Sequence, residues 1–536
     1  MSAEVEVRAS SRRASSRRAL LGLGAALAAG AIAGESLAAA DPAEAAPAKR
    51  AFVGRQYPTA SAAAAAARGA RSAVFAHDPR EHLLRRATFG PRPADRKRLK
   101  RLGIDAWLDL QLHPGRIDDG RAKKAVQRFP LAFARPAAVV KGSKRYSWDA
   151  GFQTGQATLA RQVFSDRQLY EVVVDVFADH LHVPVPSEQW HTGPGYVRDV
   201  IRAHAFGRFE DMLQAAMRHP AMLSFLSNDE SDRRNVNENL GRELLELHTV
   251  GLQARYSEKD VRASAGILSG RTWDWKKGVY RFDPDRHVTG RLRVLGFSHP
   301  NRPGQGEAVG DAYLRYLAHH PATARTIARK LAIRFVSDTP SADLVNRLAR
   351  VYLRNGTDIR AVVTAVFRSS DFWHAVGTRM RRPLEDAVGA LRVLDVKPAA
   401  GMRQPLEWLY WNLDSAGHAP LRWAPPNGYP DVAAAWLGAG AMLQRWDLHR
   451  AFVHGWWPKL TWTKPSRLVK RTDGMTTVQW AAAVGRRLTG TTPKRAHLVA
   501  AVRGAGLEVG APAPVDDWTC GKVAALLLDS PYFQLR

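Results

Sequence analysis

The spacing of apolar residues constrains this chain more than any other feature, because it recurs at every third or fourth position from residue 78 to the end. Such spacing is typical of helices that bury one face against their neighbours. It is clear in Leu83, Leu84 and Ala87, in Val173, Val174 and Phe177, and in Ile327, Leu331 and Ile333. The sequence therefore predicts a mainly α, multi-helical fold, and its first helix begins at Pro79 with Asp78 as the cap.

One short segment departs from the helical pattern. Trp273, Trp275, Val279, Tyr280 and Phe282 flank Lys277-Gly278, which predicts a β-hairpin or an irregular aromatic loop. A second helical region runs from Arg382 to the end and is interrupted at 423–431, which is rich in Pro and Gly. We therefore expect two helical lobes, 78–380 with the aromatic insertion and 381–536.

The N-terminus has the pattern of an export signal. Arg17-Arg18 precede an Ala/Gly-rich apolar run, and Ala38-Ala39-Ala40 offer a cleavage site. We expect residues 1–40 to be a twin-arginine signal peptide and residues 41–77 an Ala/Pro-rich linker. The mature protein would then be extracellular, periplasmic or associated with the cell wall, and no later stretch predicts a transmembrane span.

The chain is strongly basic, with a net charge of +29 over 536 residues. Removing residues 1–40 takes away five arginines and three glutamates and leaves +27. Such a charge favours an anionic envelope polymer or polysaccharide as partner, or anionic lipid head groups, although a basic surface also serves solubility alone. The single cysteine, Cys520, excludes an intramolecular disulfide and a cysteine-rich metal site.

The densest group of polar residues lies between Asn235 and Gly251. Asn235 can cap a helix with Glu238 three residues on, and Gly251 stands where a left-handed helix end is expected. At about 100° per residue, one stripe of this helix carries Asn239, Arg242, Glu243 and Glu246. The opposite side carries Leu240, Leu244 and Leu247, with His248 beside them.

Three interpretations of this acidic stripe remain open. Glu243 and Glu246 can divide into general acid and base if burial separates their pKa values. They can hold a hard divalent cation such as Ca²⁺ or Mg²⁺, so a divalent metal is a possible cofactor. They can also form a solvated face, with Arg242 paired to Glu238 and to Glu246, which is the ordinary state of such a stripe.

Two further groups of residues suggest weaker sites. Histidines and acids gather at Asp175, Asp179, His180, His182, His191, His204 and His219, but no His-Glu-x-x-His pattern is present. Histidines at such positions more often cap helices than bind zinc. The aromatic residues Trp273, Trp275, Tyr280, Trp423 and Tyr429 can stack on sugar rings or cover the edges of the core.

Several function classes find no support. There is no Gly-x-Gly-x-x-Gly turn, no Walker loop and no Gly-x-Ser-x-Gly elbow, which disfavours nucleotide-dependent enzymes and α/β-hydrolases. The export signal argues against nucleic acid as a partner.

The string from Asn237 to Gly251 resembles the signature of a large bacterial family called domain of unknown function 1800. Other segments that resemble this family follow in the same order, at 82–90, 201–209, 219–223, 320–324, 329–331 and 533–536. The resemblance extends over residues 78–536. It implies an exported, mostly helical protein and directs attention to Glu243 and Glu246, because the signature centres on them.

The resemblance also carries an expectation about partners and two departures. Members of this family are commonly encoded near sulfatase-like secreted proteins, which implies a possible sulfatase-like partner in the processing of an exported polymer. The chain has Gly270-Arg271 where the family pattern has Gly-Trp, and His287-Val288 where it has His-Asp. If that aspartate is a ligand or base in relatives, the chemistry is weakened or lost here.

Two functions follow as expectations. The first is a hydrolase or lyase acting on an envelope or extracellular polysaccharide, with Glu243 and Glu246 as acid and base, Arg242 tuning them and His204 or His287 assisting. The second is a non-catalytic polymer-binding or accessory protein that works with a sulfatase-like partner. A metal-dependent oxidoreductase or hydrolase is a third option. Burial of the two glutamates in a cleft favours chemistry, and exposure favours binding.

Overall fold

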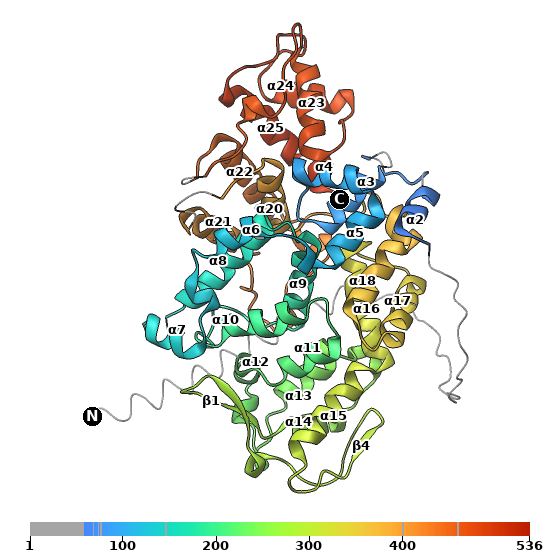
Figure 1. The fold of residues 1–536 in the computed structure, drawn as a ribbon, viewed down its shortest axis with the longest axis vertical. Helices are drawn as coiled ribbons and strands as arrows, with labels where there is room; N and C mark the ends of the chain where they lie inside the picture. Colours follow the sequence, from blue (N-terminus) through green and yellow to red (C-terminus); the bar gives the residue numbers. More distant parts are fainter. Residues whose placement is uncertain are drawn as a thin grey trace. The chain divides into compact units, whose positions relative to one another are not determined.

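The computed structural model describes residues 58–67, 69–72, 74–75, 78–144, 147–398, 401, 403–457 and 460–536. The expected signal peptide, 1–40, and the first part of the expected linker lie outside the described residues. Tyr57–Arg536 forms one compact unit. The prediction of a mainly α fold is confirmed, since helices alternate with short loops and the strands form two small hairpins (Figure 1).

The α-helices are α2 (Ala60–Ala66), α3 (Pro79–Ala87), α4 (Pro93–Leu102), α5 (Ile104–Leu112), α6 (Gly120–Val126), α7 (Pro136–Gly142), α8 (Asp149–Phe164), α9 (Gln168–His180), α10 (Gly193–Gly195), α11 (Phe209–Ala216), α12 (Pro220–Phe225), α13 (Asn239–Glu243), α14 (Glu258–Leu268), α15 (Gly306–Ala318), α16 (Pro321–Phe335), α17 (Ala342–Arg354), α18 (Ile359–Arg368), α19 (Ser370–His374), α20 (Pro383–Val393), α21 (Arg403–Ser415), α22 (Ala439–His454), α23 (Thr477–Thr489), α24 (Arg495–Gly504), α25 (Asp517–Asp529) and α26 (Pro531–Gln534). Two π-helices are η3 (Tyr196–Arg202) and η5 (Leu244–His248). The 3-10 turns are η1 (Pro114–Arg116), η2 (Pro130–Phe133), η4 (Asn228–Glu230), η6 (Leu252–Ala254), η7 (Pro284–Arg286), η8 (Ala433–Trp436) and η9 (Pro465–Arg467). The strands are β1 (Arg271–Asp274), β2 (Val279–Phe282), β3 (Leu292–Val294) and β4 (Phe297–His299).

The start of the predicted helical region is confirmed at α3. Asp78 caps this helix, its carboxylate accepting from the backbone N–H groups of Arg80 and Glu81 at 2.9 and 3.2 Å, and Pro79 is the first helical residue. Part of the expected linker is also folded, because α2 lies within it and buries Ala60, Ala63 and Ala64 against the core.

The predicted aromatic hairpin is confirmed as β1 and β2, which pair antiparallel with Trp273 opposite Tyr280. Its turn contains Gly278 with φ of 64°, a backbone conformation that favours glycine. A side chain at this position would also meet Pro136 of α7, since a Cβ would lie 2.4 Å from that ring. The second hairpin, β3 with β4, was not predicted, because its strands have three residues each.

One continuous apolar core runs from Ala60 to Phe533, and the predicted lobe boundary at 380/381 falls inside this core. The backbones of Gly90 and Gly389 touch, so that a Cβ on Gly90 would lie 2.7 Å from the other glycine. Arg392 of α20 donates to the carbonyl oxygens of Gly90 and Val163 at 2.6 and 2.7 Å. In Figure 1, α23 to α25 lie at one end of the unit and the hairpins at the other, with α9 and α20 between them.

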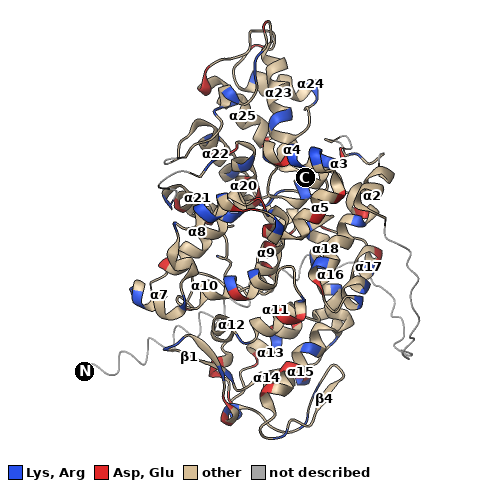
Figure 2. Cartoon of the chain, in the orientation of Figure 1, with Lys and Arg blue, Asp and Glu red and all other residues tan. Residues whose placement is uncertain are grey.

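A buried ionic cluster joins α9, α16 and α20. Glu385 pairs with Arg334, with Arg536 at 3.0 Å and with Arg382 at 3.3 Å, and Arg382 reaches Asp175 at 2.5 Å. Burial alone would raise the pKa of Glu385, but Arg334, Arg536 and Arg382 outweigh it and hold that pKa well below its usual range. Such a cluster stabilises the fold only while it is complete, because removal of one partner leaves an uncompensated buried charge. Figure 2 shows opposite charges gathered around α9 and α20.

Within the described residues, no helix is both long enough and apolar enough to cross a bilayer.

Candidate functional site

The helix that carries the acidic stripe begins later than predicted. The prediction that Asn235 is the N-cap is wrong, since α13 begins at Asn239 and Glu238 is its N-cap. Asn237 helps to start the helix, because its side-chain oxygen accepts from the N–H of Asn239 at 3.0 Å. A second asparagine two residues along the chain offered the same local chemistry, and the sequence pattern did not separate the two.

At Leu244 the helix widens into the π-helix η5, which was not predicted. It ends where the hydroxyl of Thr249 donates to the carbonyl oxygen of Leu244 at 2.6 Å and the N–H of Gly251 to that of Leu245 at 2.9 Å. π-Helical turns are rare and are frequently found at functional sites. The extra residue in the turn also changes which side chains share one face of the helix. Leu244 is buried as predicted, but Leu247 is only half-buried.

Two close contacts fix this helix to the core. Gly241 packs against α14 so tightly that a Cβ would lie 2.5 Å from the backbone nitrogen of Ala265. His248 lies beside the leucines as predicted and exchanges hydrogen bonds with His180 of α9, each ring contacting the carbonyl oxygen of the other residue at 3.1 Å. Burial lowers the pKa of His248 to about 4, so this ring is neutral and holds the helix in place.

The two glutamates of the stripe are half-buried and adjacent. Burial, and then the neighbouring carboxylate of Glu246, raise the pKa of Glu243 to about 7, while Arg242 opposes the rise. Tyr256 joins this pair from the following loop. Burial and then Glu246, whose carboxylate interacts with the tyrosine hydroxyl, raise the pKa of Tyr256 to about 12. We call Glu243, Glu246 and Tyr256 the acidic triad.

Arg242 pairs with Glu238 at 3.2 Å, as predicted for a helical i,i+4 pair, and with Glu258 at 2.6 Å. Glu258 takes the place of the predicted partner, Glu246, so the guanidinium is drawn toward the N-terminus of α14. Asn239, at the start of the stripe, is exposed. The arrangement places one carboxyl with a pKa of about 7 beside a second carboxylate, a pairing that general acid–base chemistry can use.

The two histidines expected to assist lie in other surroundings. His287 is buried at the base of the hairpins, where its ring nitrogens contact the carbonyl oxygen of Ser269 at 2.8 Å and the side-chain oxygen of Asn301 at 2.9 Å. His204 is half-buried, and burial lowers its pKa although Asp211 opposes the change. Within the described chain, neither ring forms a hydrogen bond or an ion pair with the acidic triad. Sequence analysis missed Tyr256, because a lone tyrosine in a loop belongs to no pattern.

The predicted aromatic residues form two groups. On the first hairpin, Trp273 donates to Asp229 at 2.8 Å and Tyr280 to Glu307 at 3.1 Å. Trp275 leaves 44% of its surface exposed and can offer a stacking face.

In the second group, Trp423 packs on Tyr429 with ring centroids 5.1 Å apart. Tyr429 is buried and donates to the carbonyl oxygen of Ala419 at 2.8 Å, so it covers the core.

The acidic face of α9 lines a small cavity of about 20 Å³, which has room for about one water molecule. Its lining includes Asp175, Asp179, His418 and Tyr429. Burial raises the pKa of Asp179 to about 7 although Arg382 opposes the rise. This cavity is too small for a sugar ring, and its acids are held by the ionic cluster.

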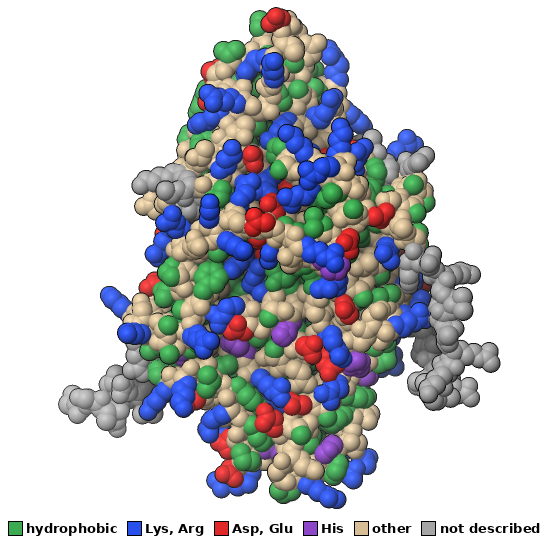
Figure 3. Space-filling model, viewed as in Figure 1, with side chains coloured by type: hydrophobic (Ala, Val, Ile, Leu, Met, Phe, Trp, Pro, Cys, Tyr) green, Lys and Arg blue, Asp and Glu red, His purple; other side chains and the backbone are tan. Residues whose placement is uncertain are grey.

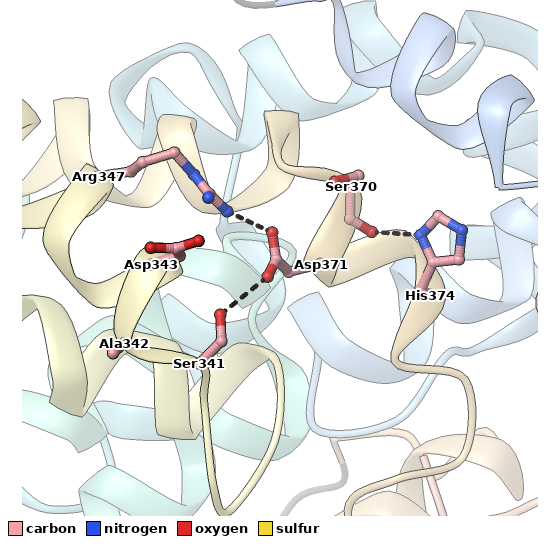
Figure 4. A pocket seen from close by; sticks show the side chains of 7 residues that line it. All are labelled: Ser341, Ala342, Asp343, Arg347, Ser370, Asp371 and His374. Atoms are coloured by element: carbon pink, nitrogen blue, oxygen red, sulfur yellow. Dashed lines mark hydrogen bonds and ion pairs between the residues drawn. The ribbon is translucent and has the colours of Figure 1, made fainter.

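A larger pocket of about 580 Å³ lies at the surface between α17 and α19 (Figure 4). In it Asp371 accepts from Ser341 at 3.2 Å and from Arg347 at 2.6 Å, and the ring of His374 contacts the carbonyl oxygen of Ser370 at 2.8 Å. These polar groups satisfy one another at helix ends, so they are already committed to structure.

Over the described part of the chain, no three His, Cys, Asp or Glu side chains converge in a way that can hold a metal ion. At the first departure from the family pattern, Arg271 is fully buried and pairs with Asp311 at 2.8 Å. At the second, the N–H of Val288 donates to the hydroxyl of Ser269 at 2.8 Å. Both positions therefore build the base of the hairpins.

Comparisons with known proteins give one result at the level of the family. No curated protein and no solved structure matches the chain. The family model described as "Protein of unknown function (DUF1800)" matches residues 82–535, from α3 to the last residues of the chain. The chain therefore belongs to the DUF1800 family.

Proposed function

We propose that the chain is an exported enzyme, a hydrolase or lyase that cleaves an envelope or extracellular polysaccharide through the acidic triad. The observation that carries this proposal is the adjacent, half-buried placement of Glu243 and Glu246, which raises the pKa of Glu243 to about 7. A raised pKa that arises from both burial and a specific charged neighbour marks a candidate acid–base site. The paired arginines near the N-terminus support export.

In this proposal Glu243 gives a proton to the leaving glycosidic oxygen. Its pKa of about 7 leaves about half of the Glu243 carboxyl groups protonated at neutral pH. Glu246 acts as the base, toward water in a hydrolase or toward the sugar in a lyase. Arg242, which is paired with Glu258, limits the rise in the pKa of Glu243 through its positive charge. His204 and His287 take no part, since their contacts lie elsewhere.

The test uses the purified mature protein with a panel of acidic and neutral envelope polysaccharides. Release of reducing ends reports hydrolysis, and unsaturated products report a lyase. We expect Glu243→Gln and Glu246→Gln to lower the rate at least about 100-fold, which is typical for the loss of a general acid or base. Glu407→Gln, at an exposed position of α21, is the matched control and should keep full activity. Equal activity in all four proteins would contradict the proposal.

A second candidate function is a non-catalytic polymer-binding or accessory protein that works with a sulfatase-like secreted partner. The net charge favours it, and Figure 3 shows Lys and Arg side chains spread over the visible face. The exposed face of Trp275 can add stacking to a sugar. Salt-sensitive polymer binding that survives both Glu→Gln changes, without any product, would favour this function over the enzyme.

A further inference from the structure

A pocket of about 390 Å³ lies at the N-terminal end of α9, away from the residues of the acidic triad. Three arginines line it, Arg167, Arg202 and Arg360. They come from the residue before α9, from η3 and from α18, so the fold brings together charges that are far apart in the sequence. Tyr170 and Phe206 form an aromatic wall, with their ring centroids 6.0 Å apart.

One of the three arginines has its charge compensated inside the protein. Arg202 forms a bidentate pair with the buried Glu171, at 2.7 and 2.8 Å. Its backbone carbonyl oxygen accepts from the hydroxyl of Tyr170 at 2.5 Å. Arg202 therefore acts as a fixed part of the wall.

The other two arginines keep their charge for a ligand. Arg167 donates through Nε and Nη2 to the carbonyl oxygen of Ile117, at 3.1 and 2.8 Å, which orients the guanidinium without neutralising it. Arg360 lies over the ring of Phe206, 5.8 Å from its centroid, and its buried Nε has no hydrogen-bond partner. Within the described residues, neither Arg167 nor Arg360 has a carboxylate at ion-pair distance.

A second, smaller cavity of about 60 Å³ continues this basic wall. Arg202 lines both cavities, and Arg161 and Arg198 complete the smaller one. Arg161 lies over the ring of Phe133, 5.0 Å from its centroid, and burial followed by the charge of Arg202 lowers its pKa to about 10. Arg161 therefore adds a partly desolvated positive charge beside the pocket, whereas Arg198 is paired with Asp199 and Arg202 with Glu171.

We propose that the pocket lined by Arg167, Arg202 and Arg360 is a binding site for an oxyanion, the sulfate or phosphate substituent of an acidic sugar chain. Arginine suits this ligand, because its planar fork donates two parallel hydrogen bonds to such a group. The volume accommodates a charged substituent together with the sugar that carries it. The inference extends the proposed function to sulfated or phosphorylated polymers, but the binding itself does not depend on any turnover by the acidic triad.

The experiment measures binding by calorimetry at low ionic strength, first with inorganic sulfate and phosphate and then with a sulfated and a phosphorylated oligosaccharide. Arg360→Gln and Arg167→Gln should each weaken binding about tenfold or more, because each removes charge-assisted hydrogen bonds. Arg360→Lys keeps the charge but not the fork, and should recover part of the affinity. Tighter binding of one oligosaccharide than of its free ion identifies the substituent that the polymer carries.

Arg368→Gln is the matched control, because Arg368 lies on the same helix as Arg360 and is exposed. It should bind as the wild type does. Equal losses in Arg368→Gln and Arg360→Gln would reduce the effect to net charge and overturn the proposal, and so would unchanged binding in Arg360→Gln. Thermal unfolding of each variant checks that the protein is folded under the conditions of the binding experiment. Because no product is measured, failure here leaves the test of Glu243 and Glu246 untouched.

Discussion

The same neighbours raise the pKa of two different acids, the carboxyl group of Glu243 and the hydroxyl of Tyr256. Burial disfavours the charged form of both groups, and the carboxylate of Glu246 disfavours a second negative charge beside it. Arg242 limits both effects from the edge of the site, where Glu258 holds it. The chemistry proposed for the chain thus arises from burial and from one adjacent charge.

A conservative change at Tyr256 tests the state of its hydroxyl. The hydroxyl of Tyr256 interacts with Glu246 without forming a hydrogen bond of good geometry, so Tyr256→Phe should change the free energy of unfolding by less than about 1 kcal/mol. Tyr352→Phe is the control, since the hydroxyl of Tyr352 donates to the carbonyl oxygen of Ala318 at 2.8 Å and its loss should cost about 1–2 kcal/mol. Denaturant unfolding measures both. A larger loss in Tyr256→Phe than in Tyr352→Phe would contradict the prediction.

Among the elements, the junction of α13 and η5 decides where the acidic triad lies. α13 is held against α14 at Gly241, and η5 is held against α9 at His248. Between these two contacts the helix takes the wider π turn. The helical segment that carries Glu243 and Glu246 is therefore fixed at both ends.

Substitution of Gly241 tests this contact. A Cβ at this position would lie 2.5 Å from the backbone of α14, so Gly241→Ala should destabilise the fold by about 1–3 kcal/mol or more. Gly440→Ala is the control, because Gly440 lies in α22 with open space around it and should gain about 0.5–1 kcal/mol. Shifts of opposite sign in the unfolding midpoints of the two variants, relative to the wild type, would support the packing described. A Gly241→Ala variant as stable as the wild type would contradict it.

A helix or hairpin could be predicted from the sequence where neighbouring residues determine its structure. Asp78-Pro79 at a helix start and Lys277-Gly278 between aromatic residues define their structures through local chemistry, and both predictions are confirmed. The π turn at Leu244 was missed, because it depends on tertiary contacts that no helical spacing contains. The placement of Tyr256 beside Glu246 and of Arg360 beside Arg167 was missed for the same reason.

At the scale of the whole molecule, buried charge joins the middle of the described chain to its last part. The ionic cluster around Glu385 includes Arg334 and Arg536, and a second buried group joins His449 of α22 to Asp386 of α20 and Asp529 of α25. Such groups make stability depend on pH, because their proton affinities differ between the folded and unfolded states.

His449 provides the clearest pH dependence. Burial alone would lower its pKa, but Asp386 and then Asp529 raise it to about 9 in the folded state. A histidine with a raised pKa stabilises the fold fully below its unfolded pKa of about 6.5 and loses this contribution as the pH rises through 9. Relative to His449→Gln, the wild type should therefore lose roughly 3 kcal/mol between pH 6.5 and 9. Unfolding curves across this range measure the difference, and parallel curves would contradict it.

The most direct measurement of the central claim is a carbon-13 NMR titration of the Glu243 carboxyl group, with Glu243→Gln used to identify its signal. The proposed acid–base pair predicts a midpoint near pH 7, and a lower midpoint that burial still keeps above the ordinary value of about 4.5 when Glu246→Gln removes the neighbouring charge. A midpoint near 4.5 in both proteins would mean that Glu243 is an ordinary surface carboxylate, and the proposed enzyme would lose its acid.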